Sequence, residues 1–301
     1  MPDLNLTTLI SSILSSVGVT AVGAWWLGKR WVDHRLNTEL EKTKGNIRKE
    51  IENELADTNA NRQYQLAAKT RLYSAIGPLK FQLLIACRDL ALHIRAFGLE
   101  GISYSLSPTN YYGQSTLYRI LQPLVISELI EKQIAVTDFS VDKEAVDLLV
   151  FKKLGYEALK GDKPILNNPD EDWNHQTQHL FHHSISKIVS SLIVVDGTLN
   201  RPMHFKEFEQ FLLSVHGKEV LGPLVDLIQD FTIMGKPILW VRLVFYAYCC
   251  SHIVNKLGIK IGFSEIDIHV RELLLESNNE FNRRMLEDFQ HVFSTLINGG
   301  L

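Results

Sequence analysis

The chain begins with a long uncharged segment that limits how its first residues can fold. From Leu4 to Leu27 there are 24 residues without a charged side chain. About 20 mostly apolar residues suffice for a helix to cross the hydrocarbon core of a bilayer. The serine and threonine hydroxyls in this segment can bond back to helix carbonyls, so they fit a membrane environment. The sequence therefore predicts a transmembrane helix over residues 6–28, preceded by a short tail, residues 1–5.

The C-terminal end of this predicted anchor is rich in tryptophan and basic residues. The residues that mark this boundary are Trp25, Trp26, Lys29, Arg30 and Trp31. Indole rings prefer the water–lipid boundary, and the side of a membrane protein that is richer in lysine and arginine faces the cytoplasm. Asp3 is the only charged side chain before the segment. We therefore expect a single-pass protein of the inner, cytoplasmic membrane, with its N-terminus outside and its main domain in the cytoplasm.

Two other interpretations of the first segment are less consistent with its residues. A cleaved signal peptide has a basic start and small residues at its cleavage site, whereas this segment starts beside Asp3 and ends at Trp25 and Trp26. A buried core helix rarely continues this far without a charge. The anchor is therefore the favoured interpretation, with the lipid bilayer as its first partner.

Residues 29–70 form a highly charged segment with a narrow apolar stripe. The stripe consists of Leu36, Leu40, Ile47, Ile51, Leu55 and Leu66. Spacings of eleven residues, as from Leu36 to Ile47, suit a nearly straight helix or a bundle with little left-handed supercoil. A stripe this narrow does not stabilise a lone helix in water, so the helix must pack on another surface. We expect a helical stalk or coiled coil that forms a homo-oligomer together with the anchor.

Residues 71–301 contain successive amphipathic segments and few strand signals, which predicts a multi-helix cytoplasmic domain. The expected helices are 78–97, 115–134, 141–159 after a cap at Ser140, 171–195, 204–216, 221–233, 237–257 and 264–297, the last capped by Ser264 with Asp267. The residues between 161 and 169 are expected to form a loop, and a break is expected near Asn59 and Asn61. The fold class is therefore all-α, with the transmembrane helix continuing into the stalk and the helical domain.

One internal segment is apolar enough to be compared with a second membrane span. Residues 238–254 are strongly apolar but include Arg242 and His252. A charge at the centre of a span costs roughly 2.5–3.5 kcal/mol on insertion scales. We expect a core helix here, in which Arg242 is paired or reaches the surface along its aliphatic stem.

Composition excludes some classes of function. The net charge of −3 gives no bulk argument for nucleic-acid binding. The cysteines Cys87, Cys249 and Cys250 are odd in number and lie in apolar stretches, so they do not form a disulfide framework and fit a reducing compartment. The sequence has no glycine-rich phosphate loop, nucleophile elbow or paired-cysteine motif.

A cluster of histidines gives one candidate site. His175, His179, His182 and His183 follow an acidic stretch, and on a helix His175, His179 and one of the other two share a face. Histidines spaced four apart on a helix can bind zinc. The alternative is a helix start with acidic residues that favour the helix dipole and histidines on a polar face. If the histidines bind a metal, zinc is the expected cofactor. If they lie on a polar helix face, no cofactor is expected.

Arg88 and His93 give a second candidate site. The stretch RDLALH resembles the motif of HEPN ribonucleases, in which an arginine and a histidine are separated by four to six residues. The resemblance implies two helical domains that dimerise, with the paired side chains cleaving RNA at the shared face. Arg284 and His291 give a second match with a longer spacer. Without this function, Arg88 and Asp89 would make a surface or intrahelix contact, and His93 would pack at a helix edge.

The junction between anchor and stalk carries a wider resemblance. The stretch WWLGKRWVDHRLNTELEKTK and, further on, STLYRILQPL are similar to a group of uncharacterised bacterial membrane-anchored proteins. The resemblance covers mainly residues 25–45 and 115–124. It implies a role in phage defence or another stress response, and it brings no defined activity. We therefore expect a non-enzymatic, oligomeric membrane sensor or effector with a protein partner. A membrane-tethered ribonuclease and a metal-binding domain are the alternatives.

Overall fold

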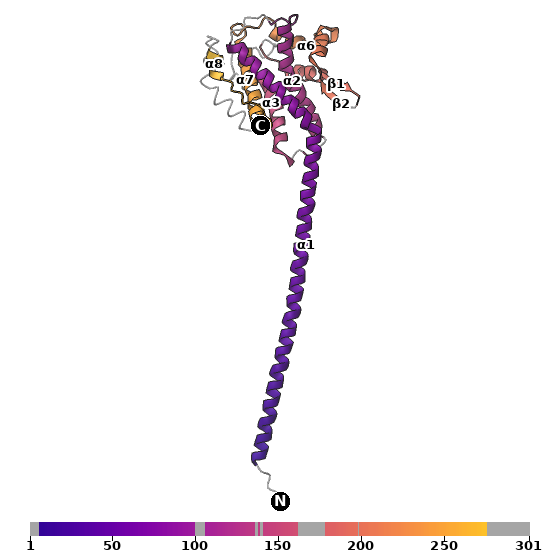
Figure 1. Cartoon of the computed structure of the whole chain (residues 1–301), viewed down its shortest axis with the longest axis vertical. Coiled ribbons are helices and arrows are strands. Elements are labelled where there is room, and N and C mark those ends of the chain that lie inside the picture. The colour runs from indigo at the N-terminus through magenta and orange to yellow at the C-terminus, as the bar shows by residue number, and fades with distance from the viewer. Residues whose placement is uncertain are drawn as a thin grey trace. The chain divides into compact units, whose positions relative to one another are not determined.

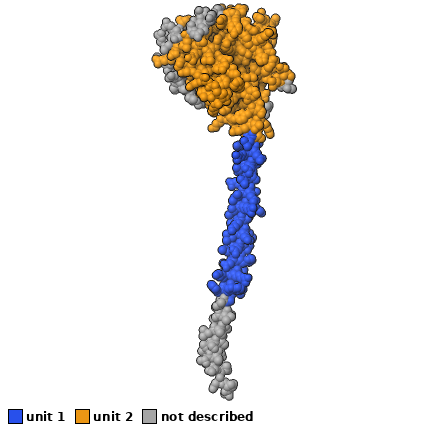
Figure 2. Space-filling view, viewed as in Figure 1, with its two compact units in different colours: residues 1–66 blue, residues 67–301 orange. Residues whose placement is uncertain are grey.

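Helices make up most of the chain in the structure, which is a computed structural model (Figure 1). It describes residues 6–99, 106–135, 138, 141–161, 178–197 and 199–275, and side chains from Gly23 onward. The chain divides into two compact units, residues 1–66 and residues 67–301 (Figure 2). The fold is mostly helical, as the sequence predicts.

The first helix, α1, is continuous over Leu6–Leu99. The predicted break near Asn59 and Asn61 is therefore wrong. An asparagine on an exposed helix surface costs only roughly 0.7 kcal/mol relative to alanine, which the flanking helix formers can offset. Most side chains of the anchor predicted at 6–28 lie outside the described part of the structure, which gives only the backbone for residues 6–22. The predicted tail at 1–5 lies outside the described residues. The membrane role of this segment stays a prediction.

Pro78 lies inside α1 rather than at the start of a new helix. A proline in a helix interior costs about 3 kcal/mol because one backbone hydrogen bond is lost. The next turns of α1 bury Leu83, Leu84 and Leu90 completely. Burial of each such side chain contributes roughly 2 kcal/mol, so packing into the core outweighs the cost of the proline.

The core of unit 2 surrounds α7 (Pro237–Ile253), which packs on α3 (Lys143–Lys160), while α3 also contacts α2 (Tyr111–Ile134). Pro237 occupies the first turn of α7, as predicted. The cap of α3 is Asp142, whose side chain accepts a hydrogen bond from the Glu144 amide at 2.7 Å. Ser140, the predicted cap, lies outside the described residues.

The apolar segment around α7 is buried in this core. Among the described helices, residues 237–261 are the one stretch that is long and apolar enough to cross a membrane, with a mean hydropathy of 1.4 in its most apolar window. Within that window, 83% of the residues are buried inside the protein. Arg242 is completely buried and donates to the backbone oxygens of Ala158 and Gly161 at 3.2 and 2.6 Å. The arginine therefore does not reach the surface.

A short β-hairpin interrupts the helices. Helix α4 covers His182–Ser191, and strands β1 (Ile193–Asp196) and β2 (Leu199–Pro202) follow as an antiparallel pair. The helix predicted over 171–195 was expected to continue to Val195, whereas α4 ends at Ser191. Ile193, Val194 and Val195 are β-branched and favour a strand, and Gly197 adopts the positive φ of +62° that the tight turn requires.

The start of the predicted 171–195 helix also differs from the structure. Residues 178–181 are not helical. The Gln178 side-chain oxygen accepts hydrogen bonds from the amides of Ile238 and Leu239 at 2.9 and 3.3 Å, and the Leu180 amide donates to the Leu159 oxygen at 2.9 Å. These contacts with α7 and α3 replace the local hydrogen bonds of a helix.

The remaining elements follow the hairpin. They are α5 (Phe205–Leu213), α6 (Val215–Ile228), the π-helical turn η3 (Val254–Gly258), the 3₁₀ turn η4 (Ile259–Ile261) and α8 (Val270–Leu275). The predicted helix start at Ser264 is wrong, because residues 263–269 are not helical. The Asn255 side chain donates to the Ile266 oxygen at 2.8 Å and accepts from its amide at 2.9 Å, which holds this segment against η3.

Candidate functional site

A cavity of about 460 Å³ lies between α1, α2 and β2 in unit 2. Small-molecule sites commonly measure roughly 300–1,000 Å³. Helix α1 lines the cavity with Gln82, Ile85, Ala86 and Asp89, and α2 lines it with Tyr118, Arg119, Gln122 and Ile126. The positions in each set are one, three or four residues apart along the helix, so each set lies on one side of its helix. Each helix therefore presents both polar and aliphatic side chains to the cavity.

The third wall is the end of the hairpin, which α2 holds in place. The Met203 oxygen accepts two hydrogen bonds, one from the Tyr118 hydroxyl and one from the Gln122 side-chain amide, both at 3.1 Å. The Met203 amide donates to the Leu192 oxygen at 2.9 Å, which extends the hairpin by one pair. The wall is thus fixed through backbone atoms, independently of which side chain position 203 carries.

Arg201 in this wall is fully paired. Its two terminal nitrogens donate to the two carboxylate oxygens of Glu207, each at 2.8 Å. The same carboxylate accepts from the His204 amide at 2.8 Å, at the start of α5. The hydrogen bond from Arg201 is the largest cause that lowers the pKa of Glu207 to about 2. The charge of Arg201 is therefore compensated by a bidentate partner.

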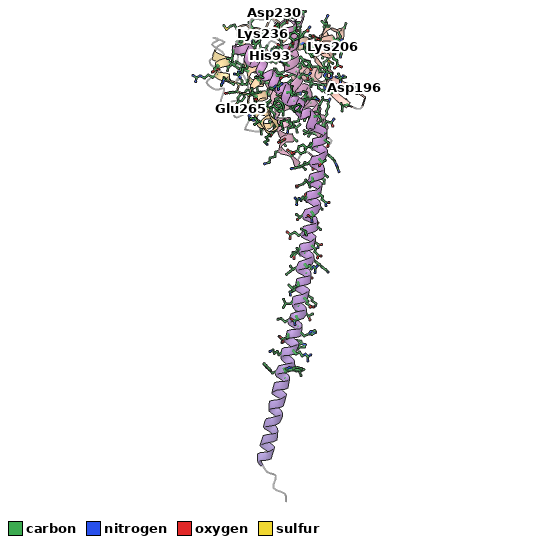
Figure 3. All side chains as sticks on the ribbon, in the orientation of Figure 1. His93, Asp196, Lys206, Asp230, Lys236 and Glu265 are labelled. Atoms are coloured by element: carbon green, nitrogen blue, oxygen red, sulfur yellow. The ribbon has the colours of Figure 1, made fainter. Side chains whose placement is uncertain are left out.

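Arg119 differs from Arg201 in its surroundings. Its described hydrogen bond goes to the Ser115 hydroxyl one turn earlier on α2, and no carboxylate within the described ranges forms an ion pair with it. On the side toward α1, His93 Nε2 lies 2.8 Å from Thr116 Oγ1 (the His93 side chain is labelled in Figure 3). Burial, and secondly the positive charge of Arg119, lower the pKa of His93 to about 4. His93 is therefore neutral near pH 7.

The structure places Arg88 and His93 in different surroundings. Arg88 donates to Asp89 Oδ1 from two nitrogens, at 3.1 and 2.9 Å, and its guanidinium lies 5.8 Å from the ring centre of Phe263. His93 instead contacts Thr116 on α2. These contacts are the intrahelix pair and helix-edge packing expected in the absence of a ribonuclease site. The dimer that the HEPN motif implies stays a prediction, and the second match at Arg284 and His291 lies outside the described residues.

The histidine cluster is only partly described. His175 lies outside the described residues. His179 is buried and packs edge-on against Phe181 at 5.2 Å between ring centres, whereas His182 packs against the Tyr156 ring at 5.4 Å and His183 is exposed. Since α4 begins at His182, His179 does not share a helix face with His182 and His183. Within the described ranges, no group of three or more metal-ligating side chains comes together, and the zinc site stays a prediction.

A second cavity of about 660 Å³ lies between α3 and the end of α7. Its ionisable side chains are His252 and the pair Asp147 and Lys256, which lie 2.8 Å apart. Burial is the main cause that lowers the pKa of His252. Asp147 and Lys256 compensate each other's charge, so this cavity has no uncompensated charge among its described side chains for a charged ligand to bind. The cavity beside Arg119 does have one.

Sequence reasoning missed the cavity beside Arg119 for a physical reason. Its apolar residues on α1 and α2 have the same spacing as core residues, and the third wall belongs to a hairpin whose first strand falls mostly within the helix predicted over 171–195. The dipeptide Asp196–Gly197, directly after the β-branched run Ile193–Val195, is the signal that could have indicated a strand followed by a turn. Comparison of the chain with family models, with curated proteins and with solved structures gives no match.

Proposed function

We propose that this protein is a membrane-anchored homo-oligomer whose stalk holds several copies of a helical domain on the cytoplasmic side of the membrane. The domain would act as a sensor or effector that binds a partner. The observation that carries the proposal is the regular row of exposed apolar side chains along the stalk part of α1.

The apolar stripe is exposed along its whole length. Leu36, Leu40, Ile47 and Ile51 are 60%, 47%, 50% and 57% exposed. At 100° per residue these four side chains lie within roughly 60° of one another around the helix axis. Single exposed apolar residues are common on proteins, but a row on one helix face is typical of a surface that another helix covers. A second copy is the occupant we favour, because every copy brings the same stripe.

The residues at the membrane end of the stalk also support the proposal. Lys29 lies 5.6 Å from the ring centre of Trp25, Arg30 lies 5.1 Å from that of Trp26, and Arg35 lies 5.1 Å from that of Trp31. All three indoles are more than half exposed to the surroundings. Indole rings with cations beside them suit the level of the lipid headgroups, where the ring meets the apolar boundary and the cation meets phosphate.

The resemblance of residues 25–45 and 115–124 to membrane-anchored proteins found among defence genes suggests phage defence as the biological setting. The HEPN-type ribonuclease and the zinc-binding domain stay predictions, since the described contacts of Arg88, His93 and the histidine cluster favour neither.

The proposal is tested by comparing the full chain with residues 33–301. We expect the full chain to float with liposomes in a density gradient and to exceed monomer mass in detergent by mass photometry. Residues 33–301 should lose flotation and keep part of the self-association through the stalk. Monomers in both preparations would overturn the oligomeric part, and a full chain that stays at the bottom of the gradient would overturn the anchor.

A further inference from the structure

The cavity between α1, α2 and β2 contains one arginine that none of the described carboxylates neutralises. Arg201 is paired with Glu207 through two bonds of 2.8 Å, and Asp89 accepts both of its described bonds from Arg88. Arg119 has a neutral hydroxyl as its described partner, and it lines the same cavity. A half-buried guanidinium without a carboxylate is costly unless an anion completes it.

The rest of the cavity is suited to an apolar body. Ile85 and Ala86 on α1 and Ile126 on α2 contribute aliphatic surface, and Met203 adds a polarisable side chain from the hairpin. A ligand that places its charge at Arg119 would cover these side chains with its remaining atoms. The volume of about 460 Å³ matches a small molecule rather than a folded partner.

We propose that this cavity binds a small amphipathic anion, with a carboxylate or phosphate headgroup on Arg119 and an aliphatic body against Ile85, Ala86 and Ile126. Arginine is suited to both headgroups because its planar fork donates two parallel hydrogen bonds. A cationic ligand would instead be repelled by Arg119, and Asp89 is already paired with Arg88. This binding goes beyond the proposed function and does not depend on oligomerisation through the stalk.

Isothermal titration of the full chain in lipid nanodiscs, with empty nanodiscs as the reference, tests the proposal. The probes share a six-carbon body: hexanoate, hexyl phosphate, hexan-1-ol and hexylamine. We expect hexanoate, hexyl phosphate or both to bind at least about tenfold more tightly than the alcohol and the amine, since a charged hydrogen bond contributes about 1.5–3 kcal/mol. The difference between the two acids identifies the headgroup. Equal binding of all four probes, or binding of none, would overturn the proposal.

Variants separate the cavity from general charge effects. Arg119→Gln should remove the preference for the acids, whereas Arg119→Lys should keep part of it. Arg71→Gln is the matched control, because Arg71 is an exposed arginine of α1 that does not line the cavity, and binding to this variant should stay within about twofold of the wild type. Ala86→Phe should block binding by filling the cavity. Binding of hexanoate and hexyl phosphate that is unaffected by Arg119→Gln contradicts the assignment.

Discussion

His93 on α1 lies 2.8 Å from the hydroxyl of Thr116 on α2, and this hydrogen bond joins the two helices next to the candidate cavity. Burial and the nearby charge of Arg119 lower the pKa of His93 to about 4, from the ordinary value of 6.5 that the unfolded chain retains. The unfolded chain therefore binds more protons between these two values, so the free energy of unfolding decreases as the pH falls from about 6.5 to about 4.

We expect His93→Gln to flatten part of this pH dependence. Between pH 6.5 and pH 4, His93 should account for a loss of on the order of 3 kcal/mol in the free energy of unfolding. Above pH 6.5 none of this free energy is lost. The measurement is urea unfolding from pH 7 to pH 4. His183→Gln on the exposed start of α4 is the control and should retain the wild-type slope. Some slope should remain in His93→Gln, because burial also lowers the pKa of His252; a slope identical to the wild type would contradict the assignment to His93.

Arg242 stabilises the end of α3 from within the core. Its guanidinium donates to the oxygens of Ala158 and Gly161, and a cation at a helix C-terminus is favoured by the helix dipole. Arg242→Ala should lower the free energy of unfolding by about 3 kcal/mol or more, because it leaves buried carbonyls unbonded and creates a cavity. Arg242→Met fills the space without the bonds and should be less destabilising. Chemical unfolding of both variants checks the order, and equal stability of Arg242→Ala and the wild type would contradict it.

Lys236 closes the C-terminal end of α6. Its ammonium donates to the backbone oxygens of Asp226, Leu227 and Gln229 at 3.0, 2.8 and 3.1 Å. Lys236→Met should lower the free energy of unfolding by about 1–2 kcal/mol, since these oxygens then rely on water. Lys206→Met removes an exposed lysine on α5 (both lysines are labelled in Figure 3) and should change stability little. Equal effects of the two substitutions in thermal melts would show that Lys236 does not act as a cap.

The three cysteines are free and buried, as their apolar surroundings predict. Burial raises the pKa of the Cys249 and Cys250 thiols, which keeps them protonated. Since the thiolate is the reactive form, none of the three should react with a thiol reagent within minutes in the native protein. All three should react in guanidinium chloride. Rapid reaction of a native cysteine would place that residue at the surface.

Several features of the fold could be predicted from local sequence, because they depend on interactions between residues close together in the chain. The start of α7 follows from the position of Pro237 in its first turn. The buried side of α1 around Cys87 follows from the helical spacing of its apolar residues. The hairpin, the non-helical segment at Gln178 and the continuity of α1 through Pro78 could not be predicted in this way. They depend on contacts such as those from Gln178 to Ile238 and Leu239, which join residues far apart in the sequence. The cavity at Arg119 depends on the same long-range placement.

Self-association through the stalk can be tested with two matched double variants of residues 33–301. Ile47→Glu with Ile51→Glu places two carboxylates on the stripe, while Thr38→Glu with Ala56→Glu places two on the far side of the helix, roughly 140–180° away. Circular dichroism checks that both remain helical, and sedimentation velocity gives the mass. We expect the wild type and the far-side variant to exceed the monomer mass and the stripe variant to sediment as a monomer. A monomeric wild type, or a stripe variant with the wild-type mass, would contradict the account.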